Sequence, residues 1–215
     1  MDGMKFARLG ATKARHLIIF FHGLGGNVNS MKSLASTWSA SLPSTAFLLL
    51  EAPTQNDWFG FPRKRAADES EADFVEAVAL PSVRSAVARV NGVIDKVLSD
   101  EGLSNEQLVL CGFSQGAAVS AYAALGRQCL AVMPFGGPCP PRQVLLPDKS
   151  TTRVCVITGD QDPYAPHQDI CAAFGKYTKV DAATDGVHVI AGMRHELTKE
   201  HDQRGLAFLQ SCGLE

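Results

Sequence analysis

Long apolar runs are absent from this sequence of 215 residues. The apolar runs that occur, such as Leu17–Phe21, are far shorter than the roughly 20 residues with which a helix crosses a bilayer. The N-terminal residues Met1–Lys5 show no export signal. We therefore expect a cytoplasmic protein with no stable membrane insertion.

A strong excess of charge is also missing. The formal net charge is −2 and no basic run is longer than Arg63–Arg65, so nucleic acid is not an expected partner. The six cysteines include no Cys-x-x-Cys pair, and Cys111 and Cys155 lie within apolar runs. Thiols in such runs behave as small hydrophobic groups, so we expect reduced, buried cysteines and no metal site.

The composition, 46% hydrophobic and 20% charged, is that of an ordinary globular protein, and the length suits a single domain spanning residues 1–215. The expected strands are His16–Phe21, Thr45–Leu50, Gln107–Cys111, Leu130–Met133, Arg153–Thr158 and Val187–Ala191. The expected helices between them are Ser30–Ser41, Leu80–Ser99, Gln115–Gly126, Ala165–Tyr177 and Leu197–Ser211. Because the strands are nearly continuous in apolar residues, we predict an α/β fold with a mostly parallel central sheet and helices on both faces.

Two segments interrupt this alternation, and we predict both to be irregular. Gln55–Ala79 mixes aromatic, basic and acidic residues, and Phe135–Ser150 contains two adjacent glycines and four prolines. Each follows the expected C-terminal end of a strand. Ligands bind at that edge in open α/β sheets, so both segments are candidates for the walls of a site.

The segment Gly112–Gly116, with the sequence Gly-Phe-Ser-Gln-Gly, lies between an expected strand and an expected helix. Gly-x-Ser-x-Gly in that context is typical of a nucleophile elbow, in which the serine occupies a tight, strained turn. The flanking glycines permit the close backbone approach that such a turn requires. We therefore predict that Ser114 is a nucleophile.

A serine hydroxyl needs a base that takes its proton and an acid that orients the base. In this architecture the chain order is Ser, acid, His. Asp160 and Asp162 both follow the strand that ends near Thr158. Local sequence leaves both open, although the glycine before Asp160 suggests a turn and the proline after Asp162 fixes its backbone. His195 follows the last expected strand and is the candidate base.

The other histidines fit this role less well. His16 begins a strand at the opposite edge of the sheet, and His188 lies within a strand. We expect His167 and His201 to be solvated residues on helix surfaces.

Two backbone N–H groups are candidates for binding the negative oxygen of a tetrahedral intermediate. The first belongs to Gln115, the residue after the nucleophile. The second belongs to Leu24, in the glycine-rich turn His22–Asn27 that follows the first expected strand. No Gly-Lys-Ser or Gly-Lys-Thr follows this turn, so it is not expected to bind nucleotide phosphates.

Taken together, these motifs resemble one family, the phospholipase/carboxylesterase group of small α/β-hydrolases, which includes acyl-protein thioesterases and lysophospholipases. The matching motifs are His22-Gly23-Leu24-Gly25, Trp58-Phe59, Gly112–Gly116, Gly159–Pro163 and His195-Glu196. The resemblance runs from about residue 16 to the C-terminus. It implies an α/β-hydrolase fold without a large cap domain, selects Asp162 over Asp160, and implies a Ser114–Asp162–His195 triad that cleaves acyl esters or thioesters without a cofactor.

The resemblance also indicates a substrate pocket, with two departures that bear on specificity. The candidate pocket residues are Trp58, Phe59, Phe135, Tyr164 and Met193. Relatives commonly carry Ser, a small residue, an aromatic residue, Leu and Pro where this chain has Pro134–Pro138. Tyr164 stands where an aliphatic residue is more usual.

Several functional alternatives remain open at this stage. Within the hydrolase class, the substrate is a protein acyl thioester, a lysophospholipid or a short-chain ester. Outside that class, a non-catalytic binding protein of the same fold is the alternative, because a fold alone does not give a function. A serine peptidase is a weaker alternative. We expect a monomer or a weak homodimer.

Overall fold

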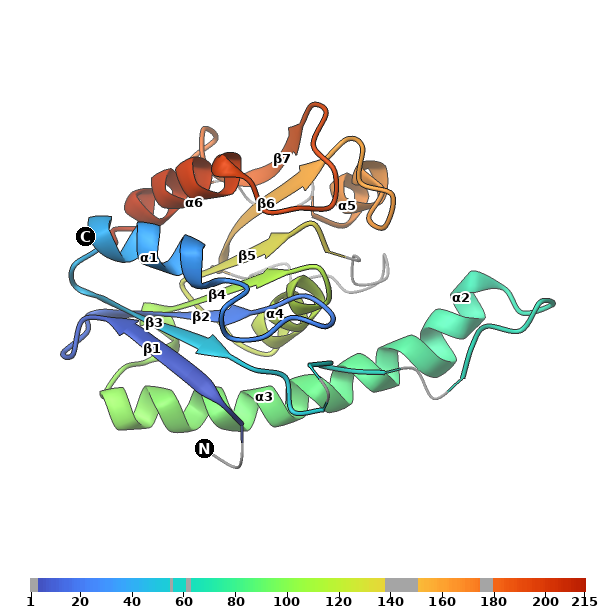
Figure 1. The fold of residues 1–215 in the computed structure, drawn as a ribbon, viewed down its shortest axis with the longest axis horizontal. Helices are drawn as coiled ribbons and strands as arrows, with labels where there is room; N and C mark the ends of the chain where they lie inside the picture. The colour runs from blue at the N-terminus through green and yellow to red at the C-terminus, as the bar shows by residue number, and fades with distance from the viewer. Residues whose placement is uncertain (1–3, 55, 61–62, 138–150, 175–179) are drawn as a thin grey trace.

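The computed structural model describes residues 4–54, 56–60, 63–137, 151–174 and 180–215. Within them lies a seven-stranded sheet with the order β1-β3-β2-β4-β5-β6-β7 (Figure 1). The strands are β1 (Phe6–Gly10), β2 (His16–Phe21), β3 (Thr45–Leu50), β4 (Leu108–Phe113), β5 (Ala131–Phe135), β6 (Arg153–Gly159) and β7 (Gly186–Ile190). All neighbouring strands pair in parallel except β1 and β3, which are antiparallel. The predicted α/β architecture is confirmed.

The strand that the sequence analysis missed is the edge strand β1. Its residues are half-buried or exposed, whereas every residue of β3 beside it is buried. An antiparallel edge strand with one solvated side does not need a continuous apolar run, so the signal that revealed the parallel strands is weak here.

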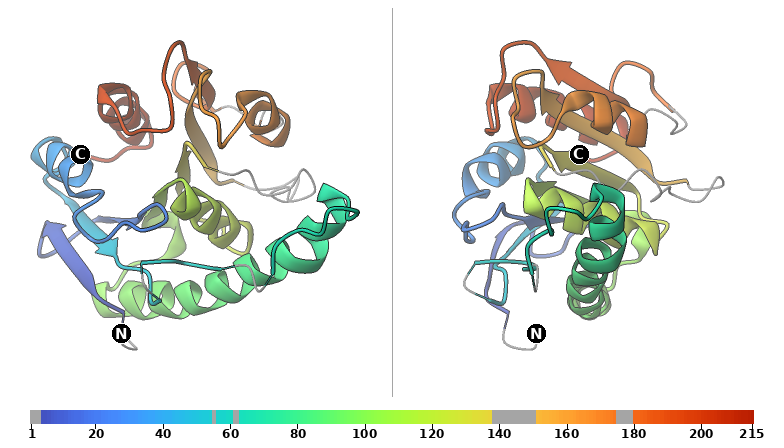
Figure 2. Two further views of the ribbon diagram at one scale, coloured as in Figure 1. Left: turned by 45° about the vertical axis from the view of Figure 1, so that its right-hand side comes forward. Right: turned by 90° about the vertical axis from the view of Figure 1, so that its right-hand side faces the viewer.

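Helices cover both faces of the sheet (Figures 1 and 2). They are α1 (Lys32–Ser41), α2 (Glu71–Phe74), α3 (Leu80–Glu101), α4 (Gln115–Leu125), α5 (His167–Phe174) and α6 (Lys199–Ser211). Helices α1 and α6 pack on the face that contains Ile18 and Phe20, and α3, α4 and α5 pack on the face that contains Leu17 and Ile19. Because the inner strands bury side chains on both faces, the sheet lies between two hydrophobic cores.

The segment 55–79 is not irregular throughout, which corrects the sequence analysis. Its C-terminal part forms α2 and a π-helical turn, η1 (Val75–Ala79), and both continue into α3. The three elements form one continuous rod, which packs on the body of the molecule along α3 and projects from it at the α2 end (Figures 1 and 2). Ser70 accepts the N–H of Asp73 at 3.1 Å, so the acidic run that was read as a loop forms the start of a capped helix.

The other segment predicted to be irregular begins with a strand residue. Phe135 is the last residue of β5, and Gly136 and Gly137 follow it as buried residues. Residues 138–150 lie outside the described part of the chain.

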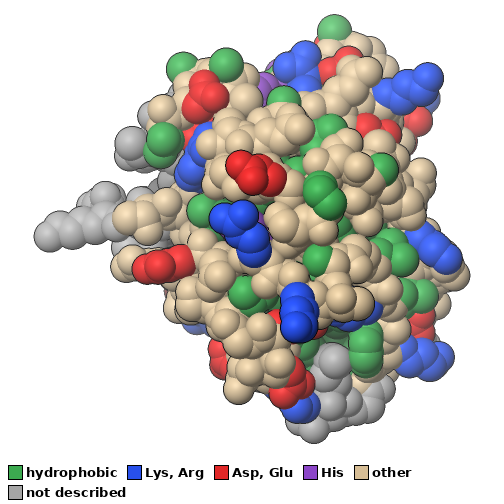
Figure 3. Space-filling model, turned by 90° about the vertical axis from the view of Figure 1, so that its left-hand side faces the viewer, with side chains coloured by type: hydrophobic (Ala, Val, Ile, Leu, Met, Phe, Trp, Pro, Cys, Tyr) green, Lys and Arg blue, Asp and Glu red, His purple; other side chains and the backbone are tan. Residues whose placement is uncertain are grey.

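None of the described helices is long and apolar enough to cross a membrane. On the face drawn in Figure 3, side chains of both charge signs are intermixed.

The turn between β4 and α4 depends on close backbone contacts. A Cβ at Gly116 would overlap the carbonyl oxygen of Phe21, and a Cβ at Gly112 would overlap the carbonyl oxygen of Gly116. Ser114 lies between them with φ of 55°, in the left-handed region that residues other than glycine rarely adopt. The glycines therefore let the start of α4 lie directly against the end of β2.

We predict that Gly116→Ala lowers the free energy of unfolding by about 1–3 kcal/mol, because the new methyl group meets backbone that cannot move aside. Gly92→Ala is the matched control, since Gly92 lies inside α3 with open space around its missing Cβ. That change should raise stability by up to about 1 kcal/mol through helix propensity. Urea unfolding of both variants tests this, and equal stabilities would contradict the proposed backbone contact.

Candidate active site

The loops that follow β4, β6 and β7 bring a hydroxyl, an imidazole and a carboxylate into one hydrogen-bonded line. Ser114 Oγ lies 2.8 Å from His195 Nε2. His195 Nδ1 lies 2.7 Å from Asp162 Oδ2. If Nδ1 donates to the carboxylate, Nε2 is left as an acceptor for the serine hydroxyl. This is the arrangement in which an imidazole can remove the hydroxyl proton.

The two aspartates of the β6 loop have different contacts. The carboxylate of Asp162 is buried, and its second oxygen accepts the N–H groups of Tyr164 at 2.9 Å and Ala165 at 3.1 Å. Asp160 instead accepts the N–H of Gly192 at 2.7 Å, on the loop that carries His195. Thus the geometry brings Asp162 to the imidazole, and Asp160 ties the two loops together.

Aromatic rings flank the imidazole of His195. The ring of Phe113 lies 4.9 Å away and that of Tyr164 lies 5.1 Å away with an edge-on orientation. Tyr164 is 74% exposed, so it stands at the solvent side of the imidazole. Gly136 lies beside the site with φ of 47°, and a Cβ there would lie 3.1 Å from the ring of Phe113. The glycine in this unusual Pro134–Pro138 segment therefore allows the β5 loop to approach closely.

The two predicted N–H donors both lie beside Ser114. Gln115 is the next residue and begins α4. Gly23, the residue before Leu24, is so close that a Cβ there would lie 3.2 Å from the Cβ of Ser114. Among the hydrogen bonds of the described residues, neither the Leu24 nor the Gln115 N–H is used. Both groups, and the positive end of α4, are thus available to an anion next to Ser114.

His22 supports the glycine-rich turn from inside the protein. Its Nε2 accepts the N–H of Ala52 at 3.0 Å, which leaves Nδ1 to donate to the carbonyl of Gly23 at 2.7 Å. Burial lowers the pKa of His22, while the contact with the Gly23 carbonyl and the charge of Glu51 oppose that shift. The sequence analysis assigned His22 no role of its own. Its position directly before the glycines was the signal that was available.

Three of the five predicted pocket residues are buried in the hydrophobic cores. Phe135 and Met193 are 0% and 5% exposed, and Trp58 is 1% exposed. The indole N–H of Trp58 donates to the carbonyl of His22 at 2.8 Å. These side chains support the site from beneath. Phe59 is half-buried and Tyr164 is exposed, so these two offer surface to a ligand.

His201 is buried, so the prediction that it is solvated was wrong. Its Nδ1 accepts the N–H of Thr198 at 3.0 Å in a capping box at the start of α6. Burial lowers its pKa to about 4. The hydroxyl of Thr198 donates to the sulfur of Met193 at 3.4 Å. A threonine three residues before a hydrogen-bonding side chain was the sequence signal, although Glu or Gln usually fills that position.

The described cysteines are free thiols. The prediction that they are buried holds for Cys111, Cys129 and Cys155, whereas Cys171 and Cys212 are half-buried. Cys111 and Cys155 are fully buried, and burial raises the pKa of both thiols. Cys139 lies outside the described residues. Within the described part of the chain, no group of three or more His, Cys, Asp or Glu side chains is arranged to hold a metal ion.

A family model described as phospholipase/carboxylesterase matches residues 5–212. The chain belongs to this family. The sequence motifs had indicated this family, and the sheet and helices are those of an α/β-hydrolase.

Individual relatives agree with this membership. The chain is 31% identical over 111 residues to an uncharacterized hydrolase of Mycosarcoma maydis, a match that covers 49% of this chain and 40% of the relative. It is 27% identical over 120 residues to acyl-protein thioesterase 1 of Schizosaccharomyces pombe, covering 50% and 48% of the two chains. The matches thus span less than half of the length of these curated relatives.

Solved structures resemble the fold over nearly its whole length. Esterase PE8 has a TM-score of 0.79 and 22% identity, with 97% of this chain and 99% of that chain covered. A Bacillus cereus carboxylesterase has a TM-score of 0.70 and 15% identity, with 98% and 95% covered. At such identities the likeness establishes the fold alone.

The lowered pKa of His201 predicts how stability depends on pH. The unfolded chain takes up the proton near pH 6.5, whereas the folded chain resists it down to about pH 4. This contribution is therefore fully present above pH 6.5 and is lost as the pH falls toward 4, by up to about 3 kcal/mol. We expect His201→Gln, which keeps the cap, to reduce this loss in urea unfolding from pH 7 to 4. His167→Gln is the control, and equal slopes for His201→Gln and wild type would contradict the assignment.

Proposed function

We propose that this chain is a serine hydrolase of carboxylic esters or thioesters that forms an acyl-enzyme on Ser114. The observation that carries the proposal is the line of Ser114, His195 and Asp162, with contacts of 2.8 and 2.7 Å. Membership of the phospholipase/carboxylesterase family supports it independently.

In the first step, His195 takes the proton of Ser114 as the serine oxygen attacks the substrate carbonyl. The Leu24 and Gln115 N–H groups bind the oxygen that becomes negative. His195 then gives the proton to the departing alcohol or thiol, and the acyl group stays on Ser114. An alcohol leaves poorly as an alkoxide, and the protonated imidazole is already positioned to supply the proton that it needs.

In the second step, His195 removes a proton from water, and the resulting hydroxide attacks the acyl-enzyme. Collapse of the new tetrahedral intermediate returns the proton to Ser114 Oγ and releases a carboxylic acid. Asp162 stays ionised throughout, holds the required imidazole tautomer and stabilises its cation. Each step uses only water and groups of this chain, so the proposed mechanism needs no cofactor.

A protein acyl thioester is the proposed substrate class, supported by the thioesterase named among the relatives. Lysophospholipids and short-chain esters share the same carbonyl chemistry. Phe59 and Tyr164 are the proposed apolar contacts for the acyl group, because they combine proximity to the site with exposed surface. Rates for aryl esters and thioesters of increasing chain length would distinguish the substrate classes.

A non-catalytic binding protein is the competing function, and covalent labelling separates the two. We expect a fluorophosphonate probe to label wild-type protein at Ser114, and Ser114→Ala to abolish both labelling and ester hydrolysis. A folded wild-type protein that hydrolyses no ester or thioester and reacts with no probe would contradict the proposal.

The two neighbouring aspartates provide a matched test of the triad. Asp162→Asn should lower kcat by about 10³–10⁴-fold, since the imidazole then loses its orienting carboxylate and the favoured tautomer. Asp160→Asn removes the same charge two residues away but leaves that contact intact, so we expect a loss of less than about tenfold. Steady-state hydrolysis of an aryl ester measures both, and similar losses in the two variants would exclude the distinct role of Asp162.

A further inference from the structure

The side chain of Gln115 forms hydrogen bonds to the loop between β3 and α2. Its Oε1 accepts the N–H of Trp58 at 2.9 Å. Its Nε2 donates to the carboxylate of Asp57 and to the carbonyl of Phe59, the latter at 2.7 Å. Gln115 is 9% exposed, so these bonds are sheltered from water. One buried amide therefore connects three consecutive residues of a loop to the first residue of α4.

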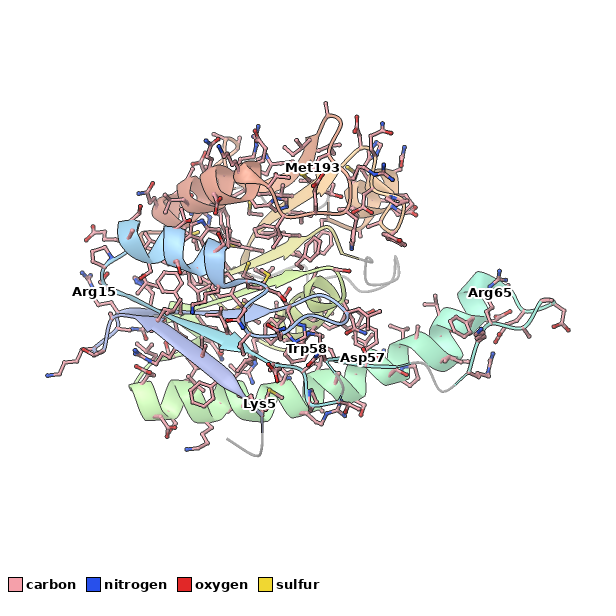
Figure 4. All side chains as sticks on the ribbon, viewed as in Figure 1. Lys5, Arg15, Asp57, Trp58, Arg65 and Met193 are labelled. Carbon is pink, nitrogen blue, oxygen red and sulfur yellow. The ribbon has the colours of Figure 1, made fainter. Side chains whose placement is uncertain are left out.

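The same loop holds the glycine-rich turn that follows β2. The carbonyl of Asn56 accepts the N–H of Gly25 at 3.0 Å, and the indole of Trp58 donates to the carbonyl of His22 at 2.8 Å. Asp57 and Trp58 lie beside that turn (Figure 4). Contacts on both sides of Leu24 thus lead back through the loop to Gln115.

The loop does not depend on Gln115 alone for its internal shape. The N–H of Asp57 donates to the carbonyl of Thr54 at 2.8 Å, and Asn56 has φ of 64°, a left-handed conformation that asparagine tolerates. The guanidinium of Arg89 on α3 donates to the carbonyl of Trp58 at 3.2 Å. Because the turn is preformed, its attachments to α4 through Gln115 and to α3 through Arg89 set its position as a unit.

We propose that the Gln115 side chain is a positioning residue that fixes the Leu24 N–H relative to the N–H of Gln115 itself. This inference rests on the proposed function, in which the two groups bind the same oxygen. The backbone of Gln115 supplies one donor, and its side chain holds the loop that places the other. The spacing of the two donors therefore depends on the side chain of the residue that supplies one of them.

The hydrogen-bonding requirements explain why glutamine suits this position. The loop presents one donor, the Trp58 N–H, and two acceptors, on Asp57 and Phe59. A primary amide supplies one carbonyl oxygen and two N–H donors. A glutamate would lack both donors and would place its charge against the Asp57 carboxylate, and an alanine would remove all three of these hydrogen bonds.

Gln115→Ala should lower kcat for an aryl ester by at least tenfold and leave KM within about threefold, because a misplaced donor weakens binding of the transition state more than binding of the substrate. The rate of fluorophosphonate labelling at Ser114 should fall in parallel. Gln203→Ala, on the exposed side of α6, is the matched control and should change neither rate.

A charge exchange gives a second test that does not depend on removing the side chain. Gln115→Glu should lower kcat by at least about tenfold through repulsion with Asp57. Asp57→Asn alone should cost about threefold, because the new amide must turn its oxygen toward Gln115. In the double variant, the amide introduced at position 57 can donate to the carboxylate introduced at position 115. We therefore expect the double variant to recover at least half of the decrease in log kcat that Gln115→Glu causes.

The outcomes separate this inference from the proposed function. A wild-type protein without hydrolysis or labelling would remove the proposed function and this inference with it. An active wild-type protein with unchanged kcat in Gln115→Ala would overturn the inference alone. So would a rise in KM at constant kcat, which would assign the loop to substrate contact. Additive losses in the double variant would overturn it as well, and thermal unfolding of each variant verifies that the protein is folded.

Discussion

The contact between the start of α4 and the end of β2 is the constraint on which the rest of the site depends. Gly116 lies against the carbonyl of Phe21 with no space for a side chain. This contact turns the chain sharply after β4 and holds Ser114 in a left-handed conformation. It also sets the glycine-rich turn after β2 directly beside the serine. A single close approach therefore determines both where the hydroxyl points and which backbone amides surround it.

Much of this architecture was predictable because parallel strands buried on both faces require nearly continuous apolar runs. β2 and β3 begin and end at the predicted residues. β1 was missed because an edge strand with a solvated side carries no such run. The acidic residues before α3 were read as a loop, since charge alone does not distinguish a solvated helix from irregular chain. Their capping by Ser70 depends on a local geometry that composition does not record.

The candidate site was predictable to a different extent. The Gly-x-Ser-x-Gly motif between a strand and a helix indicated Ser114, and chain order and position at one sheet edge indicated His195. The resemblance favoured Asp162 over Asp160. The directions of the side chains were not predictable. Trp58 donates its indole N–H to the carbonyl of His22, and the ring centroid of His201 lies 4.8 Å from that of Phe135. Such directions depend on contacts between elements far apart in the sequence, which no local pattern encodes.

The loop between β7 and α6 is fastened at several points around its histidine. Asp160 holds the N–H of Gly192, the carbonyl of Met193 accepts the N–H of Gln161 at 3.1 Å, and His201 caps the helix that follows. Because this segment is so constrained, the imidazole of His195 loses its conformational freedom when the chain folds. Reaching a reactive geometry then carries little additional entropy cost, and thermal motion of the backbone contributes little to the spread of imidazole orientations.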